Sequence, residues 1–270
     1  MPLNKLCEIE DWALPGMAET MRRLMPDLAQ TLPMYPFGYE HRKVWEYAHV
    51  LLGLEKIGGL RPDAFVLSIG AGHEEPLYEM TNRVRWVFAT DIYGQGNFGD
   101  NIAPSSMLIN PDQYARCPYN RNRLVVQHMS ALDLRFEPAT FDVVYSFSTI
   151  EHVGTLEEVQ RMFSEVHRVL KPGGIAVITT ECVVNQAPQL ECPGLYLFHP
   201  DTIRGFDGLA PGLRLIEPIN FSVSPLTVAN PPALVDLMEE WKAGRNVYPL
   251  VAEQYEGRVY TSVCMFFRKR

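Results

Sequence analysis

The 270-residue sequence predicts an α/β fold, a doubly wound domain around a mostly parallel sheet, preceded by a helical extension. Three observations indicate this fold. From Phe65 onward, short apolar segments alternate with amphipathic ones, as strands and helices do when right-handed crossovers join them. One apolar segment runs directly into a glycine-rich turn. The first sixty residues instead space their apolar side chains as amphipathic helices do.

Residues 1–60 are expected to form a helical cap over the substrate, without strands. Side chains three or four positions apart indicate one helix face: Met17, Met21, Leu24 and Leu28. A second helix is expected from about Tyr39 to Leu54. Residues 61–270 form the main domain in this interpretation, with a helical insert near residues 225–255.

The strands expected in the main domain are FVLSIG, VRWVFAT, LVVQHM, FDVVYSF and IAVITT, and then LRLIEPINF and VYTSVCMFFRKR at a hairpin-like edge. The helix before IAVITT has the clearest limits. Thr155 and Glu158 make a capping box at its start, and the sequence KPGG after Leu170 ends it. Three more helices are expected, at about Glu75–Asn82, Pro200–Phe206 and Pro232–Lys242.

Composition narrows the class of protein. The net charge of −8 gives no electrostatic reason to bind a phosphate polymer, so nucleic acid is not an expected partner. No apolar run approaches the roughly 20 residues of a membrane-spanning helix, and the start does not resemble a secretion signal. The five cysteines and seven histidines show no metal-ligand spacing. A cytoplasmic protein with reduced thiols and no metal is therefore expected.

The strongest local signal is the turn Gly70-Ala71-Gly72, which follows the strand VLSI and precedes a helix. Glycines let the backbone bend sharply and approach a ligand closely, and the helix start offers N–H groups. The turn alone is weak evidence, because the same pattern also occurs as plain punctuation between a strand and a helix.

Asp91 is the second signal, about twenty residues after the glycines at the end of the strand VRWVFAT. A carboxylate there can accept hydrogen bonds from both hydroxyls of a ribose. Asp91 can also simply cap the turn that follows the strand. Taken with the glycines, it suggests an adenosyl group lying over the carboxyl ends of the strands.

A third motif, FDVVYSFSTIEHVG from Phe141 to Gly154, completes a recognisable series with VLSIGAGHEEPLYEMTNRV, FATDIYG and HRVLKPGGIAVITTE. The series resembles class I S-adenosylmethionine-dependent methyltransferases, and in particular small-molecule and sugar O-methyltransferases. The resemblance covers roughly residues 62–181. It implies a Rossmann-like sheet of seven strands, the last antiparallel, with S-adenosyl-L-methionine as cofactor and S-adenosyl-L-homocysteine as product.

Carried over by position, the resemblance implies that Gly70, Ala71 and Gly72 line the amino-acid part of the cofactor and that Asp91 holds the ribose. Ile92 would pack on the adenine, and Ser146 and Phe147 would face the sulfonium. Ser130 stands where the family usually has an Asp for the adenine amino group, so Ser130 with the backbone of Ala131, or else Asp133, would hold the base. The remaining expected cofactor contacts, beside the glycines, are Ser68 and Glu74.

His152 is the candidate general base, because an imidazole takes up and releases a proton near neutral pH and lies just beyond the fourth strand of the series. Glu151 is expected to orient it or to bind a substrate hydroxyl. The alternative, that Glu151 and His152 only support the cofactor pocket, stays open.

The acceptor pocket is expected beneath the segment Tyr39–Tyr47, where aromatic rings can stack on sugars and polar groups can bind hydroxyls. The expected contacts are Tyr39, His41, Arg42, Trp45 and, from the long stretch 93–123, Tyr93. The segment Phe198–Asp201 is a third candidate wall. Any one of these residues can equally belong to an amphipathic helix packed on the domain.

The leading hypothesis is methyl transfer to a hydroxyl of a sugar or natural product, in glycan or natural-product biosynthesis. The partners expected are a small-molecule acceptor, such as a saccharide, and a second copy of the chain in a homodimer. Acceptors with nitrogen, carbon or carboxylate atoms remain alternatives, as does a binding module without turnover. An NAD(P)-dependent oxidoreductase is disfavoured, because its fingerprint needs a third glycine where this chain has Glu75.

Overall fold

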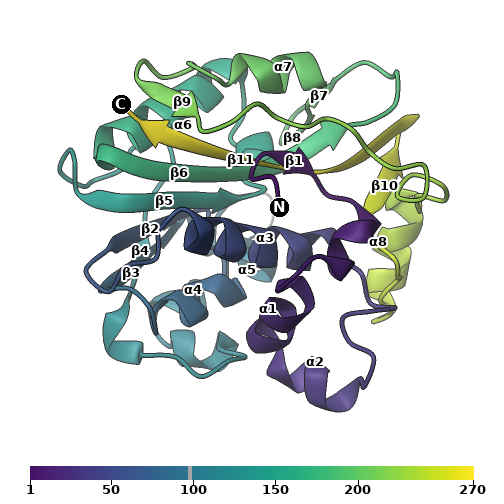
Figure 1. The fold of residues 1–270 in the computed structure, drawn as a ribbon, viewed down its shortest axis with the longest axis horizontal. Coiled ribbons are helices and arrows are strands. Elements are labelled where there is room, and N and C mark those ends of the chain that lie inside the picture. Colours follow the sequence, from purple (N-terminus) through teal and green to yellow (C-terminus); the bar gives the residue numbers. More distant parts are fainter. Residues whose placement is uncertain (97–98) are drawn as a thin grey trace.

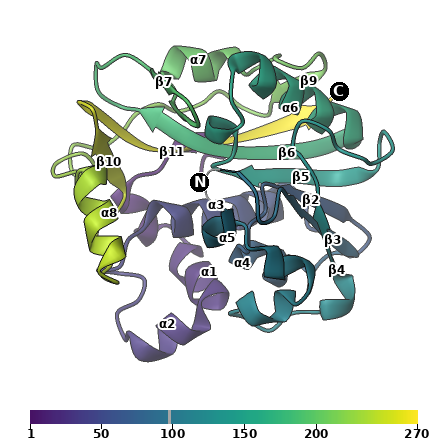
Figure 2. The same ribbon diagram turned by 180° about the vertical axis from the view of Figure 1, so that it is seen from behind.

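The computed structural model describes residues 1–96 and 99–270, leaving aside the side chains of residues 99 and 100. A twisted sheet crosses the molecule and helices cover both of its faces (Figures 1 and 2). Its main strands lie in the order β4-β3-β2-β5-β6-β11, of which the first five are parallel and β11 is antiparallel. They are β2 Phe65–Ile69, β3 Trp86–Asp91, β4 Leu124–His128, β5 Phe141–Phe147, β6 Leu170–Val183 and β11 Arg258–Lys269. The α/β prediction is confirmed.

Three short strands share the outer edge of β11, and each pairs with it antiparallel: β9 Leu213–Leu215, β1 Lys5–Leu6 and β10 Ala252–Tyr255. Together they take the place of the seventh strand. The expectation of no strand in the first sixty residues is wrong, because β1 belongs to this edge. A two-residue strand is too short to carry the alternating pattern by which strands are recognised.

Alternate residues of the strands point to different helical layers. Val66 and Val143 pack in one apolar cluster with α1 (Met17–Leu24), α3 (Arg42–Lys56) and α4 (Glu75–Met80). Leu67 and Val144 pack in the other with α6 (Leu156–Val169) and α7 (Pro200–Gly205). Figures 1 and 2 show these two groups of helices on opposite faces of the sheet. Burial on both faces explains why the parallel strands read as nearly continuous apolar runs.

Proline changes the expected N-terminal helix. Pro26 begins a separate helix, α2 (Pro26–Thr31), so Leu28 does not continue the face of α1. The second expected helix begins at Arg42 instead of Tyr39. The capping box is confirmed, since Thr155 Oγ1 accepts a hydrogen bond from Glu158 N at 3.3 Å and the Glu158 carboxylate accepts one from Thr155 N at 2.8 Å. The KPGG sequence lies within β6, which starts at Leu170.

Strand β6 continues beyond the predicted IAVITT to Val183, and a hairpin of β7 (Leu190–Cys192) and β8 (Leu195–Leu197) follows it. Helix α8 (Leu234–Lys242) forms the expected insert. The remaining helices are α5 Gly99–Ile102 and five 3-10 helices, η1 Ile9–Ala13, η2 Ser105–Leu108, η3 Pro111–Tyr114, η4 Arg121–Arg123 and η5 Ile150–His152. Positions 97 and 98 of the predicted wall 93–123 lie outside the described residues.

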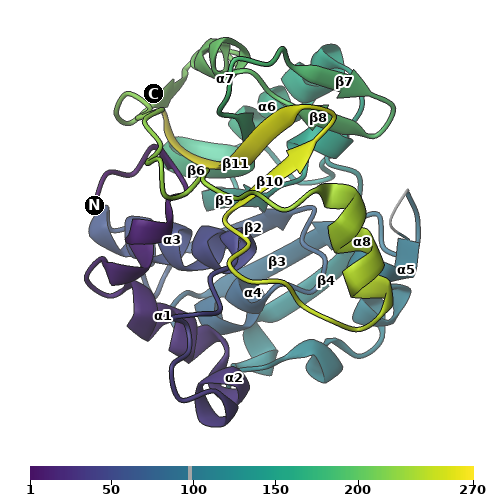
Figure 3. The same ribbon diagram turned by 90° about the vertical axis from the view of Figure 1, so that its right-hand side faces the viewer.

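The carboxyl ends of the parallel strands meet at one edge of the sheet, which is where open α/β sheets bind ligands. Figure 3 looks onto this edge, with α8 and β10 in front of the strand ends. Within the described residues, no helix combines the length and the apolar character that a membrane span requires.

Candidate functional site

The glycine turn after β2 is possible only with glycine at two positions. Gly70 and Gly72 have φ of +63° and +46°, in the left-handed region that other residues rarely adopt. A Cβ at Gly70 would lie 2.2 Å from Thr149 Oγ1, and a Cβ at Gly72 would lie 2.8 Å from the carbonyl oxygen of Ile102. The turn is therefore a tight cradle enclosed by two neighbouring segments.

Asp91 is joined directly to this turn. One carboxylate oxygen accepts a hydrogen bond from Gly72 N at 2.8 Å, and the other accepts one from Ile92 N at 2.7 Å. Burial raises the pKa of Asp91, although these two N–H groups act in the opposite direction. The structure thus brings together the two motifs on which the adenosyl hypothesis depends. Each oxygen keeps a second lone pair with which to accept a ligand hydroxyl.

Ile92, next to Asp91 in the chain, is exposed. Its side chain is therefore accessible to a ligand ring. Tyr93 differs from its prediction as an acceptor contact. It is buried, and its hydroxyl donates to the carbonyl oxygen of Gly72 at 3.1 Å. Tyr93 therefore stabilises the glycine turn through this hydrogen bond.

The loop after β4 lies beside Asp91, because Met129 N donates to the Asp91 carbonyl oxygen at 2.9 Å. Ser130 and Ala131 are half-buried there, and Ser130 Oγ accepts from Leu132 N at 3.2 Å. Asp133 is exposed and lies 3.4 Å from Arg135 Nε, and its contact with the adenine stays a prediction.

Three predicted cofactor contacts lie inside the sheet. Ser68 and Ser146 are each 1% exposed, and Ser146 Oγ donates to the Ile69 carbonyl oxygen at 2.8 Å. Phe147 is equally buried and packs edge-on against Tyr47, with ring centroids 5.0 Å apart. Both serine side chains are buried because helices cover both faces of the sheet, and their contact with a cofactor stays a prediction.

His152 lies on η5 under the tip of the β7–β8 hairpin. Its Nδ1 is 2.7 Å from the carbonyl oxygen of Gly194. A carbonyl oxygen only accepts, so Nδ1 carries the hydrogen and, in the neutral ring, Nε2 carries the lone pair. This is the tautomer with a basic nitrogen at Nε2.

Glu151 was predicted to orient His152, but its hydrogen bond is to Thr180. Glu151 is fully buried, and its Oε2 accepts from Thr180 Oγ1 at 2.8 Å. Burial and the neighbouring Glu181 raise the pKa of Glu151 well above its usual value. Burial also acts to raise the pKa of Glu181, but Arg42, a hydrogen bond from Glu151 and Lys43 outweigh it and lower that pKa to about 2. Burial beside Glu181 therefore favours the protonated form of Glu151.

Arg42 connects these acids to the edge of the sheet. Its guanidinium lies 2.8 Å from Glu181 Oε1 and 2.5 Å from Glu253 Oε1, and Tyr260 donates to Glu253 at 2.8 Å. Glu46 is the other centre of this cluster. Its carboxylate accepts hydrogen bonds at 2.6–3.1 Å from three hydroxyl groups, those of Ser148, Thr179 and Ser262. We call Arg42 with Glu46, Glu151, Glu181 and Glu253 the carboxylate cluster.

The other predicted acceptor contacts differ among themselves. Tyr39 is half-buried and lies edge-on to Tyr248, with centroids 5.4 Å apart. His41 caps α3, its Nδ1 accepting from Lys43 N at 3.1 Å, and burial lowers its pKa to about 3. Trp45 is wholly buried, stacks on His49 and donates to Asp11 at 2.7 Å. Trp45 is therefore a core residue, which corrects its prediction as an acceptor contact.

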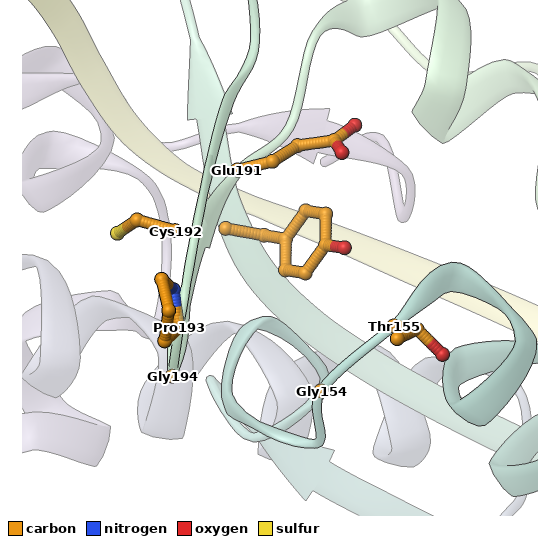
Figure 4. Close-up of a pocket in the computed structure, with 7 residues that line it drawn as sticks. Gly154, Thr155, Glu191, Cys192, Pro193 and Gly194 are labelled. Carbon is orange, nitrogen blue, oxygen red and sulfur yellow. The ribbon is translucent and has the colours of Figure 1, made fainter.

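A cavity of about 290 Å³ lies on the outer side of this region, between the turn at Gly154 and Thr155 and the hairpin segment Glu191–Gly194 (Figure 4). Tyr196 completes its lining. Because Gly194 also contacts His152, the cavity adjoins the residue proposed as base.

Sequence reasoning missed Lys43, Glu46, Glu181 and Glu253 as individual residues of the site. Two of them are buried in strands, Glu181 in β6 and Glu253 in β10. A carboxylate buried in a strand needs a partner, so this pattern was the available signal. Among the described residues, no group of three or more His, Cys, Asp or Glu side chains is placed to hold a metal ion.

The chain is similar to known methyltransferases. A family model described as a methyltransferase domain matches residues 101–178, a range that begins after the glycine turn and Asp91. Two relatives from Caenorhabditis elegans are phosphoethanolamine N-methyltransferase 2, 24% identical over 53% of this chain, and sterol 4-C-methyltransferase strm-1, 29% identical over 32%. The matched segments cover only 30% and 25% of those two proteins.

A solved structure, the [4+2]-cyclase SpnF, superposes with a TM-score of 0.55 and 14% identity over 92% of this chain and 94% of that one. At this identity the likeness shows the fold alone.

Proposed function

We propose that the chain is a class I S-adenosylmethionine-dependent methyltransferase and that it methylates a hydroxyl group of a small molecule such as a sugar. S-adenosyl-L-methionine supplies an activated methyl group on a positively charged sulfur and leaves as S-adenosyl-L-homocysteine. The observation that carries the proposal is the contact of Asp91 with the glycine turn, and the tautomer of His152 adds a candidate base.

The residues present fit this cofactor. Gly70 and Gly72 allow the tight backbone turn to which Asp91 is bound, and Asp91 has accepting lone pairs for two ribose hydroxyls. His152 Nε2 is the proposed acceptor of the hydroxyl proton as the new C–O bond forms. The hairpin tip holds the ring through Gly194, and the adjoining cavity offers space for the remainder of the acceptor.

A second candidate acceptor is an amine. The carboxylate cluster contains four buried acids and one arginine, with Lys43 as the neighbouring cation. One proton on Glu151 leaves three carboxylates against two cations, so the region favours a positively charged ligand. The relative that methylates phosphoethanolamine nitrogen supports the same alternative. A cytoplasmic location and a homodimer remain predictions from the sequence.

The experiment is an assay for S-adenosyl-L-homocysteine release over a panel of sugars, glycosides and amines, applied to the parent and to His152→Asn. Asparagine keeps a donor for the Gly194 carbonyl but has no nitrogen equivalent to Nε2. We expect turnover to fall about 10²–10⁴-fold, with cofactor affinity within about threefold of the parent.

His167→Asn, on the surface helix α6, is the matched control. Full turnover by His152→Asn with the best acceptor would remove His152 as the base. If the parent binds cofactor but turns over no acceptor, the chain is a binding module. A preference for amines over every hydroxyl compound would select the second candidate.

A further inference from the structure

A hollow of about 180 Å³ lies at the edge of the sheet opposite to Asp91 and His152. At this edge the parallel strands β5 and β6 begin and the antiparallel strand β11 ends, and the loop between α3 and β2 closes the hollow. Figure 1 shows this edge on the left, beside the marked C-terminus. The hollow is therefore separate from the proposed catalytic site. Its lining includes Gly58, Arg61, Asp142, Lys171, Gly173 and Arg268.

Cations outnumber acids in this lining. Arg61, Lys171 and Arg268 come from three different segments, and Asp142 is the one acid among the described residues that line the hollow. A second acid, Asp63, lies 3.4 Å from Arg61 Nε with a side chain that is 80% exposed. Three cations against these two acids still leave one positive charge, in a chain whose net charge is −8. A local excess of positive charge attracts small anions.

The carboxylate of Asp142 is already occupied by the protein. Its Oδ2 accepts hydrogen bonds from Phe65 N at 2.9 Å and from Lys171 Nζ at 2.7 Å, and its Oδ1 accepts one from Arg61 at 2.9 Å. Burial acts to raise the pKa of Asp142, but these donors and the two positive charges outweigh it and lower that pKa. Asp142 is therefore ionised at neutral pH, and its single charge is divided between two cations.

Arg268 has the largest unused capacity to donate hydrogen bonds. It is exposed near the end of β11, and within the described part of the chain its one hydrogen bond joins Nη1 to the carbonyl oxygen of Gly173 at 3.3 Å. A guanidinium has five N–H donors, so most of them remain for a ligand. Lys171 uses one of its three donors on Asp142, and its side chain is 41% exposed.

Two glycines leave the mouth of the hollow open. Gly58 and Gly173 have φ of +70° and +76°, and a Cβ added at either position would meet nothing within 4 Å. Their carbonyl oxygens accept hydrogen bonds from Arg61 at 3.5 Å and from Arg268 at 3.3 Å. The turns therefore hold the two arginines at the rim without filling the space between them.

We propose that this hollow binds a phosphate group, either free phosphate or the monoester of a small molecule, through Arg61, Lys171 and Arg268. A phosphate carries about two negative charges at neutral pH and offers at least three accepting oxygens, so three cations can bind it at once. The inference goes beyond the proposed function, because the ligand takes no part in methyl transfer. Bound phosphate joins the loop after α3 to β6 and β11, so it stabilises the attachment of the N-terminal segment to the sheet.

The test is calorimetry of the full chain with inorganic phosphate and with glycerol 3-phosphate, at an ionic strength held constant with sodium chloride. The parent should bind phosphate at one saturable site. In Arg268→Met and in Arg61→Met the affinity should fall about tenfold or more, because each variant removes charged hydrogen bonds to the ligand. Asp142 keeps Phe65 N and Lys171 in both variants, so the fold is retained. Affinity for S-adenosyl-L-homocysteine should stay within about twofold, because its proposed site is distant.

Arg121→Met and Arg135→Met are matched controls, since both arginines are exposed and lie outside the lining. They should bind phosphate as the parent does. An equal loss in these controls would overturn the site, because the effect would then come from total charge. Unchanged phosphate affinity in Arg268→Met, or no saturable binding by the parent, would overturn it as well. Tighter binding of glycerol 3-phosphate than of inorganic phosphate would identify a monoester as the ligand, and the reverse order would identify free phosphate.

Discussion

The glycine turn with Asp91 and the carboxylate cluster lie at the same edge of the sheet, but they satisfy their polar groups differently. Around the turn, backbone N–H groups bind one side of Asp91, and Glu74 keeps an oxygen without a partner. In the cluster, hydroxyl and guanidinium groups of the protein occupy Glu46, Glu181 and Glu253. Among the described residues, carboxylate oxygens without a hydrogen-bond partner occur in both regions, Glu74 Oε2 beside the turn and Glu151 Oε1 and Glu181 Oε2 in the cluster. The regions differ in their donors: backbone N–H groups bind Asp91, whereas a guanidinium joins two acids of the cluster.

The difference teaches what each region does for the fold. The turn and Asp91 join two adjacent strands, β2 and β3. Arg42 and Glu46, in contrast, belong to the N-terminal helix α3 and contact residues on β6, β10 and β11. The cluster therefore fastens the N-terminal segment to the far edge of the sheet, next to the turn that carries His152.

Replacing Arg42 by methionine should have the largest effect on this comparison. It leaves Glu181 and Glu253 buried without their cation, and breaking a buried pair from one side typically costs about 3–5 kcal/mol of unfolding free energy. Urea unfolding measures it. Arg135→Met, whose partner Asp133 is exposed, is the control and should stay within about 0.5 kcal/mol.

Two further measurements sharpen the result. Adding Glu181→Gln and Glu253→Gln to Arg42→Met should recover part of the loss, because no unpaired charge then remains. The folded variant should still bind S-adenosyl-L-homocysteine within about threefold of the parent. A loss of less than about 1 kcal/mol would mean that the cluster does not hold α3 in place.

The pH dependence of the unfolding free energy should have opposite signs for the residues around α3 and for those around the glycine turn. Burial lowers the pKa of His49 to about 4 and that of His41 to about 3, both on or beside α3. Between the usual value of about 6.5 and these values, the unfolded chain binds more protons than the folded one, so stability is lost as pH falls. For fully buried His49 the loss reaches about 3 kcal/mol by pH 4.

Glu74 and Asp91 act with the opposite sign. Burial raises the pKa of both, so the folded chain binds more protons and these groups withdraw stability as pH rises from their usual values near 4. Urea unfolding from about pH 4 to pH 7 tests both arms. In His49→Gln, the unfolding free energy should fall less as the pH is lowered. In Glu74→Gln, it should fall less as the pH is raised. If the unfolding free energies of the parent and His49→Gln change with pH in parallel, His49 does not cause the loss at acidic pH.

The same contrast explains how far the sequence predicts the molecule. The turn, Asp91 and the parallel strands were predicted because each depends on a short contiguous pattern. The correct limits of α6 follow from the local capping box of Thr155 and Glu158. In each case the residues that decide the structure are neighbours in the chain.

The carboxylate cluster could not be predicted in that way. Glu46, Glu181 and Glu253 come from segments more than 70 residues apart, and only the folded sheet brings them to Arg42. Trp45, Ser68 and Ser146 were predicted to contact ligands, but their side chains are buried in the fold. Their residue types suit a binding site, but the side of the helix or strand on which they lie faces the core. The direction in which a side chain points depends on tertiary packing, and a single sequence motif does not determine it.

Asp91→Asn should have the smallest and most selective effect. Asparagine retains one oxygen for Gly72 N or Ile92 N, but its NH₂ group then faces the other donor, and the negative charge toward the ribose is lost. We expect about 10- to 100-fold weaker binding by calorimetry, for S-adenosyl-L-homocysteine and 5′-methylthioadenosine alike, because both carry the ribose. A variant that weakens only S-adenosyl-L-homocysteine, which alone of the two carries an amino acid, would contradict the contact of Asp91 with the ribose.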